Sequence, residues 1–227
     1  MDSLMTRDAA RALGVSQRQV TDLLRAGKLA GEQLSDGTWL VTPRSISERR
    51  SLNAGAGRNW SAASSWALLD ELSGHSSTGL SQSTLARIRR RIRTSTAEDI
   101  ARRVATRTTA HRYAADSLAR TADDLVLTGA SAAEMIDRNL TTDKRKVEGY
   151  LCNGTLEDFV RHHLLTIDNE GDVTIYDSLK RDEFKGRHAS QSVIAADLAR
   201  SLNTRERSAG LAALDDMRHA WLARHTR

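Results

Sequence analysis

Cysteine, proline and aromatic residues are all scarce in this chain of 227 residues, and it has no long apolar run. The single cysteine, Cys152, cannot form an internal disulfide bond, which suits the reducing cytoplasm. Because only 4% of the residues are aromatic, any core must consist mainly of aliphatic side chains. No apolar stretch approaches the length of a membrane span, and the first residues lack the apolar segment of a signal peptide. We therefore expect a cytoplasmic protein with no membrane partner.

Sequence signatures of catalysis are absent as well. The chain has no P-loop, no GxGxxG, no HExxH and no paired cysteines that could hold zinc. His162 and His163 are neighbours, and on a helix their side chains would point about 100° apart, so we expect them not to chelate one ion together. Cys152 ends an apolar segment and is interpreted as a small core residue. These absences predict a protein that is not an enzyme, with no catalytic residue, no metal and no cofactor.

The net charge of +5 is distributed unevenly along the chain. Residues 1–60 carry nine basic and six acidic side chains, and residues 61–115 carry nine and four. Residues 116–227 carry sixteen basic and nineteen acidic side chains. The asymmetry indicates a nucleic-acid contact in the N-terminal half and a different partner for the C-terminal half.

Residues 6–28 show two amphipathic helix patterns separated by a glycine. Thr6 can cap the first helix, and Gly14 stands where a left-handed residue would end it. Ser16 can cap the second helix, and Gly27 would end that one. The apolar residues at helical spacing are Ala9, Ala10 and Leu13 in the first pattern and Val20, Leu23 and Leu24 in the second.

A short β-hairpin is predicted after these helices. Residues 32–34 and 39–41 can pair across a turn at residues 35–38, since Asp-Gly is a strong hairpin signal. Pro43, the only proline, fits the first turn of a short helix that follows. Two helices that cross at a glycine turn beside a two-stranded wing form a DNA-reading unit, so we expect double-stranded DNA as a partner.

The outward positions early in the second helix would face base edges in the major groove. Arg18 can make a bidentate contact to guanine, and Gln17 can do the same to adenine. Lys28 is better placed to contact a phosphate, and the acidic hairpin tip at Asp36 would repel one. The DNA-binding candidates in this unit are Gln17, Arg18, Thr21, Arg25 and Lys28.

Residues 5–46 resemble the helix-turn-helix of the MerR and excisionase-like superfamily. There the pattern A-x-x-LGVS-x-R-x-V-x-x-L-x-x-G-x-L precedes a wing that ends in a tryptophan strand, and this chain has AARALGVSQRQVTDLLRAGKL followed by GTWLV. The resemblance implies a winged helix-turn-helix DNA-binding domain over residues 1–50. Many such wings carry an arginine at the tip, which this chain lacks. The alternative is a small helical hairpin whose polar face is merely solvated.

Residues 51–59 are small and include glycines, and we interpret them as a linker to a second domain over residues 60–227. Helices are predicted from a cap at Ser61 to Leu72, from about Ser81 to Arg93 and from about Thr96.

Nine arginines and only two acidic residues lie between Leu85 and Arg112, in an arginine-rich helical part over residues 60–108. Three interpretations remain open: arginine faces that are simply solvated, a phosphate-binding surface that supplements the helix-turn-helix, or a surface that docks an acidic protein. The phosphate-binding interpretation adds three DNA-binding candidates on one side of the second of these helices, Arg87, Arg90 and Arg91.

From about residue 109 the pattern becomes mixed α and β. The strands are predicted at residues 125–127, 146–152, 164–168 and 172–177, and a turn at residues 169–171 joins the last two. The helices are predicted near Ser131, after caps at Thr155 and Thr204, and at residues 190–202. The last helix should bury one stripe of residues, Leu211, Leu214, Met217 and Trp221. The fold is thus predicted to be mainly α with an α+β C-terminal part, a winged helix-turn-helix joined to an α+β domain.

The segment TGASAAEM, residues 128–135, is similar to the phosphate site of nucleotidyltransferases, in which a Gly-x-Ser turn leads from a strand into a helix. Those enzymes also need two closely spaced carboxylates on the next strand to hold magnesium. Here that strand offers Glu148 alone, so we favour a packing turn. An enzyme of this type that uses Ser131 and Glu148 stays open as a third hypothesis.

Several phrases beyond the linker resemble the abortive-infection AbiEi-type antitoxins of actinobacteria. They are GRNWSAASSWALLDELSG, the arginine-rich helical pair, DLVLTGASAA, KVEGYL and DLARSLNTRERSAGLAAL. The resemblance implies a type IV toxin–antitoxin protein of phage defence, whose N-terminal domain represses its own promoter. It also implies that the C-terminal domain neutralises a cognate nucleotidyltransferase-like toxin, with a possible dimer on the operator DNA. The alternative function is a stand-alone MerR/excisionase-like transcription regulator with a dimerisation or ligand-sensing C-terminal domain.

Overall fold

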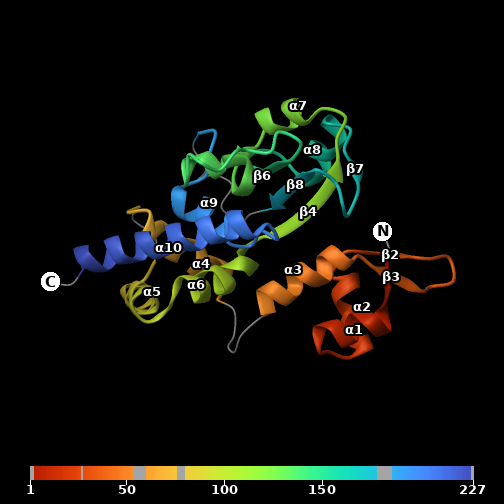
Figure 1. Cartoon of the computed structure of the whole chain (residues 1–227), viewed down its shortest axis with the longest axis horizontal. Helices are drawn as coiled ribbons and strands as arrows, with labels where there is room; N and C mark the ends of the chain where they lie inside the picture. The colour runs from red at the N-terminus through yellow and green to blue at the C-terminus, as the bar shows by residue number, and fades with distance from the viewer. Residues whose placement is uncertain (1–2, 27, 54–59, 76–79, 178–185, 226–227) are drawn as a thin grey trace.

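The computed structural model describes residues 3–26, 28–53, 60–75, 80–177 and 186–225. These residues form two parts, each with its own hydrophobic core: a head, the described residues up to 53, and a body, the described residues from 60 onward (Figure 1). The fold mixes helices with two β-sheets, as the sequence predicts in outline. The predicted end of the second helix at Gly27 and most of the predicted linker, residues 54–59, lie outside the described residues.

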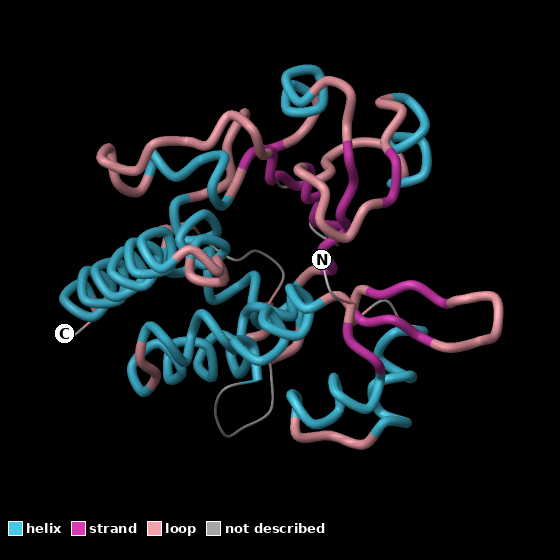
Figure 2. Tube along the Cα trace, turned by 45° about the vertical axis from the view of Figure 1, so that its right-hand side comes forward, coloured by secondary structure: helices cyan, strands magenta, loops and turns pink. Residues whose placement is uncertain are grey.

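The head contains three helices and a three-stranded sheet among its described residues. In chain order these are β1 (Leu4–Met5), α1 (Thr6–Leu13), α2 (Gln17–Arg25), β2 (Gly31–Gln33), β3 (Trp39–Val41) and α3 (Pro43–Asn53). Strand β3 lies in the middle of the sheet, antiparallel to both β1 and β2. The hairpin of β2 and β3 extends away from the body in both views (Figures 1 and 2).

Local signals determine the helix ends of the head. Gly14 adopts the left-handed conformation, with φ of 67°, and ends α1 as predicted. The Ser16 hydroxyl caps α2 by accepting the Gln19 backbone N–H at 3.2 Å. The prediction that Thr6 caps α1 was wrong, because the chain passes directly from β1 into the helix and Met5 takes the cap position. Helix α3 begins at Pro43, as predicted, but it runs on to Asn53 and so includes the first three residues of the predicted linker.

The predicted hairpin is confirmed. Gln33 pairs with Trp39, and the turn closes through a bond from the Leu34 N–H to the Thr38 carbonyl at 2.8 Å. The head core gathers the apolar faces of α1, α2 and α3 against β3. Its buried members are Ala9, Ala10, Val20, Leu24, Leu29, Val41 and Ile46.

The body contains the remaining elements. They are α4 (Ala62–Leu72), α5 (Gln82–Thr94), α6 (Ala97–Val104), η1 (Ala105–Arg107), β4 (Thr109–Ala114), α7 (Leu118–Asp123), β5 (Val126–Leu127), η2 (Gly129–Met135), β6 (Val147–Tyr150), α8 (Leu156–His162), β7 (Thr166–Ile167), β8 (Val173–Asp177), α9 (Gln191–Leu198) and α10 (Thr204–Arg224). Here η marks a 3-10 helix. Four helices of the body start where the sequence predicts, each after a residue whose hydroxyl accepts a backbone N–H three residues later: Ser61, Ser81, Thr96 and Thr155. Of these caps, the sequence predicts those at Ser61 and Thr155.

Two predicted helix starts differ from the structure. The helix expected near Ser131 is a 3-10 helix that begins at Gly129 and contains a kink at Ala132. Helix α10 is capped by Asn203, whose side chain accepts the Arg205 N–H, so Thr204 is its first residue. The stripe predicted on α10 is otherwise present, with Leu214 and Trp221 fully buried and its other two residues partly buried.

The five strands of the body form one mixed sheet in the order β5-β6-β8-β4-β7. The sequence predicts β7 and β8 joined by a turn, and the turn exists, but β4 lies between them and pairs antiparallel with both. Strand β4 itself was not predicted, because its sequence, TAHRYA, has no apolar run. Strands β6 and β8 pair in parallel.

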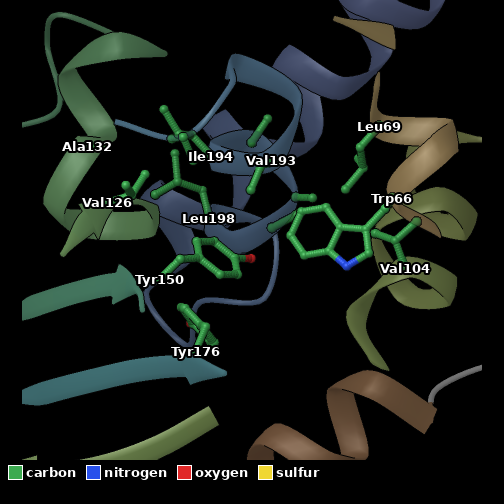
Figure 3. Packing of buried hydrophobic residues seen from close by; sticks show 14 of the residues in the cluster. Trp66, Leu69, Val104, Val126, Ala132, Tyr150, Tyr176, Val193, Ile194 and Leu198 are labelled. Carbon is green, nitrogen blue, oxygen red and sulfur yellow. The ribbon is translucent and has the colours of Figure 1, made fainter. Parts of the chain in front are cut away.

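Helix α9 is the centre of the body core. Figure 3 shows its Val193, Ile194 and Leu198 between Tyr150 and Tyr176 of the sheet on one side and Trp66 and Leu69 of α4 on the other. Helix α10 packs closely along α9, and a Cβ atom added to Gly210 would lie 2.5 Å from the Ala199 nitrogen. No helix among the described residues is long and apolar enough to cross a membrane.

Candidate nucleic-acid interface and adjoining cavity

Helix α2 separates an apolar side from a polar side. Val20 and Leu24 are buried in the head core. Gln17, Arg18 and Arg25 are exposed and lie within about 100° of arc, because one helical residue advances by about 100°. Gln17 borders the apolar side, about 20° from Leu24, and the two arginines face away from it. The three side chains could therefore meet the same surface of a partner.

Two other candidates of the head are placed differently. The Thr21 hydroxyl donates to the Gln17 carbonyl at 3.1 Å, so its donor is already used within α2. Lys28 lies beyond α2 and is exposed, and it also lines a cavity between the head and the body. At the hairpin tip, Asp36 accepts the Thr38 N–H at 2.8 Å, and this hydrogen bond lowers the pKa of its carboxyl group. The tip thus keeps its negative charge at neutral pH.

The three candidates on α5 are not brought together with those on α2. Helix α5 lies well apart from α2, with α3 and α6 between them (Figure 1). Arg90 is exposed, and Arg87 is exposed with a bond from its Nη2 to Thr84 Oγ1 at 3.1 Å. Arg91 is only partly exposed, because its guanidinium packs over the Trp60 ring at 4.9 Å. Burial lowers the pKa of Arg91, with smaller contributions from Arg87 and a further arginine.

Much of the remaining arginine-rich segment is engaged within the protein. Arg89 pairs with Glu71 at 3.4 Å, and Arg93 lies over the Trp221 ring. Arg102 pairs with Asp99 on α6. The segment therefore presents less basic surface to solvent than its number of arginines suggests.

Arg107 is fully buried in the middle of the body. Its Nη2 donates to Asp197 Oδ1 at 2.7 Å and to the Tyr150 hydroxyl at 2.8 Å. Asp197 Oδ2 accepts two further bonds, from the Tyr150 and Thr128 hydroxyls, each at 2.8 Å. Burial alone would lower the pKa of Arg107, but the adjacent Asp197 charge outweighs it and raises that pKa. The network joins η1, β6, the β5–η2 turn and α9.

A cavity of about 510 Å³ lies between the head and the body. Its walls come from α3, from the η1–β4 segment, from β6 and β8 and from the end of α9. The charged residues that line it are Lys28, Arg44, Glu48, Arg49, Arg112, Glu148, Asp197 and Arg200. Sequence reasoning missed the cavity because its walls come from segments far apart in the chain.

Three of these arginines have unused donors, and one of them is Arg112, whose Nε is buried without a hydrogen bond. The Arg49 side chain on α3 has no hydrogen-bond or carboxylate partner among the described residues, and burial lowers the pKa of its guanidinium. Arg200 Nη1 is buried without a hydrogen bond and lies 3.6 Å from Asp197 Oδ1. The cavity therefore contains positive charge from both parts of the protein that is not fully compensated.

Glu148 lies against the Gly-x-Ser turn. Its Oε2 accepts the Ala130 N–H at 3.4 Å, and its own N–H donates to Ser131 Oγ at 2.8 Å. Gly129 has a left-handed φ of 51°, and a Cβ atom there would lie 2.0 Å from Oε2, so any other residue would be strained and would displace the Glu148 carboxylate. The turn thus forms its hydrogen bonds with β6, as expected of a turn that packs a strand against a helix. Burial, and then the nearby Asp197 charge, raise the pKa of Glu148 to about 7.

The expectation that His162 and His163 point apart was wrong. His163 is the C-cap of α8 and still donates its N–H to the Phe159 carbonyl at 3.0 Å, yet the two rings meet edge to face with centroids 4.9 Å apart. Asp124, which precedes β5, completes a group whose possible ligand atoms all lie within 4.8 Å of one another. Sequence reasoning missed this group because its carboxylate, Asp124, comes from a distant part of the chain. Cys152 is half-buried, and burial raises the pKa of its thiol, which agrees with a small packing residue.

Comparison of the chain with protein-family models, with curated proteins and with solved structures finds no match.

Proposed function

We propose that this protein is a DNA-binding repressor whose head is a winged helix-turn-helix with α2 as the recognition helix. One observation carries the proposal: α2 buries Val20 and Leu24 and leaves Gln17, Arg18 and Arg25 exposed on a single arc. Amide and guanidinium groups at these positions are the donors that read adenine and guanine in the major groove. The hairpin beside the helices supplies the wing.

The contacts would divide by chemistry. Arg18 would specify guanine, Gln17 would specify adenine, and Arg25 would contact the groove or its phosphates farther along α2. Thr21 would offer mainly its methyl group, because its hydroxyl already donates to the Gln17 carbonyl. The charged tip at Asp36 argues against a strong phosphate contact by the wing.

The DNA proposal is tested by measuring binding of the full chain to a duplex from its own promoter. Fluorescence anisotropy at two or more salt concentrations separates the salt-dependent phosphate contribution from sequence preference. We expect the promoter duplex to bind at least tenfold more tightly than a scrambled duplex of equal length. Equal affinity for the two duplexes would refute specific recognition.

We further propose that the body neutralises a nucleotidyltransferase-like toxin encoded beside this chain. Two features support this: the resemblance to AbiEi-type antitoxins, and the acidic balance of residues 116–227, which suits a basic partner. The test is growth of cells that express the neighbouring gene with and without this protein. Growth arrest that this chain relieves would support the proposal. A harmless neighbour, or an arrest that this chain does not relieve, would contradict it.

The cavity favours a second candidate function, a regulator that senses a small anion. Arg49 of the head and Arg200 of the body both line the cavity with unused donors, so an anionic carboxylate or phosphate could bridge the two parts. Such a ligand would raise the thermal stability of the wild type but not that of Arg49→Ala. A screen of small dicarboxylates and phosphate esters that shifts neither protein would remove this candidate.

A further inference from the structure

We propose that Asp124, His162 and His163 form a binding site for one divalent transition-metal ion of the Zn²⁺ class. The proposal is independent of DNA binding, and the site lies in the body. Its ligand atoms come from two separate segments, the loop before β5 and the end of α8, and lie within 4.8 Å of one another.

Helix α8 is closed by a capping motif directly after the two histidines. Leu164 has a positive φ of 53°, the only such value at a non-glycine residue among those described. Its N–H donates to the Arg161 carbonyl at 3.3 Å, and the Leu165 N–H donates to the Val160 carbonyl at 2.9 Å. This pairing is that of a Schellman motif, in which glycine is the preferred left-handed residue. The motif turns the chain immediately after His163, the C-cap residue, whose own N–H still donates to the Phe159 carbonyl at 3.0 Å. The two rings therefore come together through their side-chain rotamers and not through a break in the helix before His163.

His163 is the fixed ligand of the group. Its side chain is only 3% exposed, and its ring lies against the Phe159 ring with centroids 4.3 Å apart. Its Nε2 is buried without a hydrogen bond of good geometry, yet it lies 3.0 Å from Asp124 Oδ2. Two ligands at 2.0–2.1 Å from a tetrahedral zinc ion are about 3.3 Å apart. The two atoms are therefore already near the separation that one shared ion requires.

The other two ligands can move. The Asp124 side chain is 59% exposed, and His162 is exposed as well. Rotation of these side chains can reduce the largest separation from 4.8 Å to the ligand spacing while His163 stays in place. The three residues line an open hollow of about 980 Å³, which gives an ion access and leaves a fourth coordination position for water or another ligand.

The donor set selects the class of metal. Two imidazole nitrogens and one carboxylate oxygen suit Zn²⁺ and its neighbours among the transition metals. Mg²⁺ and Ca²⁺ prefer oxygen ligands throughout, so we expect neither to compete effectively.

The test is titration of untagged full-length protein, stripped of metal with a chelator, with Zn²⁺ in a calorimeter. We expect one equivalent to bind, and Co²⁺ to give the visible absorption of a tetrahedral complex. Asp124→Asn and His162→Ala change exposed side chains, so both should fold, and each should weaken Zn²⁺ binding at least tenfold. His163→Ala should abolish it.

His219→Ala is the matched control. His219 is exposed on α10 and lies 3.4 Å from Asp215, so it too is a histidine beside a carboxylate, but it belongs to no such cluster among the described residues. Its removal should leave the affinity unchanged. Zn²⁺ binding that survives in both Asp124→Asn and His162→Ala, that is lost equally in His219→Ala, or that is absent from the wild type would overturn the proposal.

Discussion

Arg112 on β4 and Glu48 on α3 form a bidentate ion pair that joins the body to the head. The Arg112 nitrogens donate to the two carboxylate oxygens at 3.0 and 2.6 Å. Both side chains are largely shielded from solvent, with 16% and 26% exposed. The head and the body have separate apolar cores, so this polar contact helps to fix how the head is held.

Replacing Glu48 should loosen this attachment. Glu48→Ala leaves a largely buried guanidinium without its carboxylate, so we expect the free energy of unfolding to fall by about 1–2 kcal/mol in urea titrations. Glu32→Ala, which removes an exposed carboxylate from β2 of the same head, should change it by less than about 0.5 kcal/mol. Equal effects of the two substitutions would mean that the ion pair contributes nothing specific.

Asp197 should be far more sensitive than surface carboxylates. In Asp197→Asn the fully buried Arg107 loses its countercharge, and we expect a loss of about 3–5 kcal/mol or failure to fold. Asp216→Asn, at an exposed position of α10, should be nearly neutral. Urea unfolding of both variants provides the comparison, and a stable Asp197→Asn protein would contradict the role given to the network.

Glu148 should make stability depend on pH. Its pKa is about 7 in the folded protein and 4.5 for an unperturbed side chain, so the folded state holds the proton more tightly. Its contribution to stability is therefore complete below pH 4.5 and is lost as the pH rises through 7, by up to about 3 kcal/mol. Glu148→Gln should lack this component when unfolding is measured at pH 5 and pH 8. Identical pH profiles for the two proteins would show that the pKa of Glu148 is not raised.

Arg91 should matter for folding and Arg90 should not, although they are adjacent on α5. Arg91 packs over Trp60, so Arg91→Ala should lower the free energy of unfolding by about 0.5–1 kcal/mol. Arg90 is exposed and has no side-chain partner among the described residues, so Arg90→Ala should be neutral. Thermal unfolding of the two variants distinguishes them, and equal melting temperatures would contradict the packing described.

The features that sequence reasoning predicted correctly are those encoded within a few residues. Ser16, Ser61 and Thr155 each cap a helix through a bond that spans three residues, and the Asp-Gly turn closes its own hairpin. Such signals can be found in the sequence without knowledge of the tertiary fold.

The features that it missed depend on distant segments. Strand β4 is recognisable only from its partners β7 and β8, because its own residues are mostly polar. In the sequence, Arg107 looks like another exposed arginine. Its burial is explained only by its ion pair with Asp197, which lies far along the chain. The candidate DNA contacts on α2 follow from local sequence, whereas the cavity and the Asp124 group require the three-dimensional fold.

The most direct test of the central claim compares Arg18→Ala with Arg90→Ala in binding to a short duplex from the promoter. Both residues are exposed arginines, so the two variants lose the same charge, but only Arg18 lies on α2. We predict that Arg18→Ala weakens binding by about 1–3 kcal/mol and relaxes the preference at one base pair, while Arg90→Ala binds like the wild type. Equal losses in the two variants, or no loss in Arg18→Ala, would contradict recognition of DNA by α2.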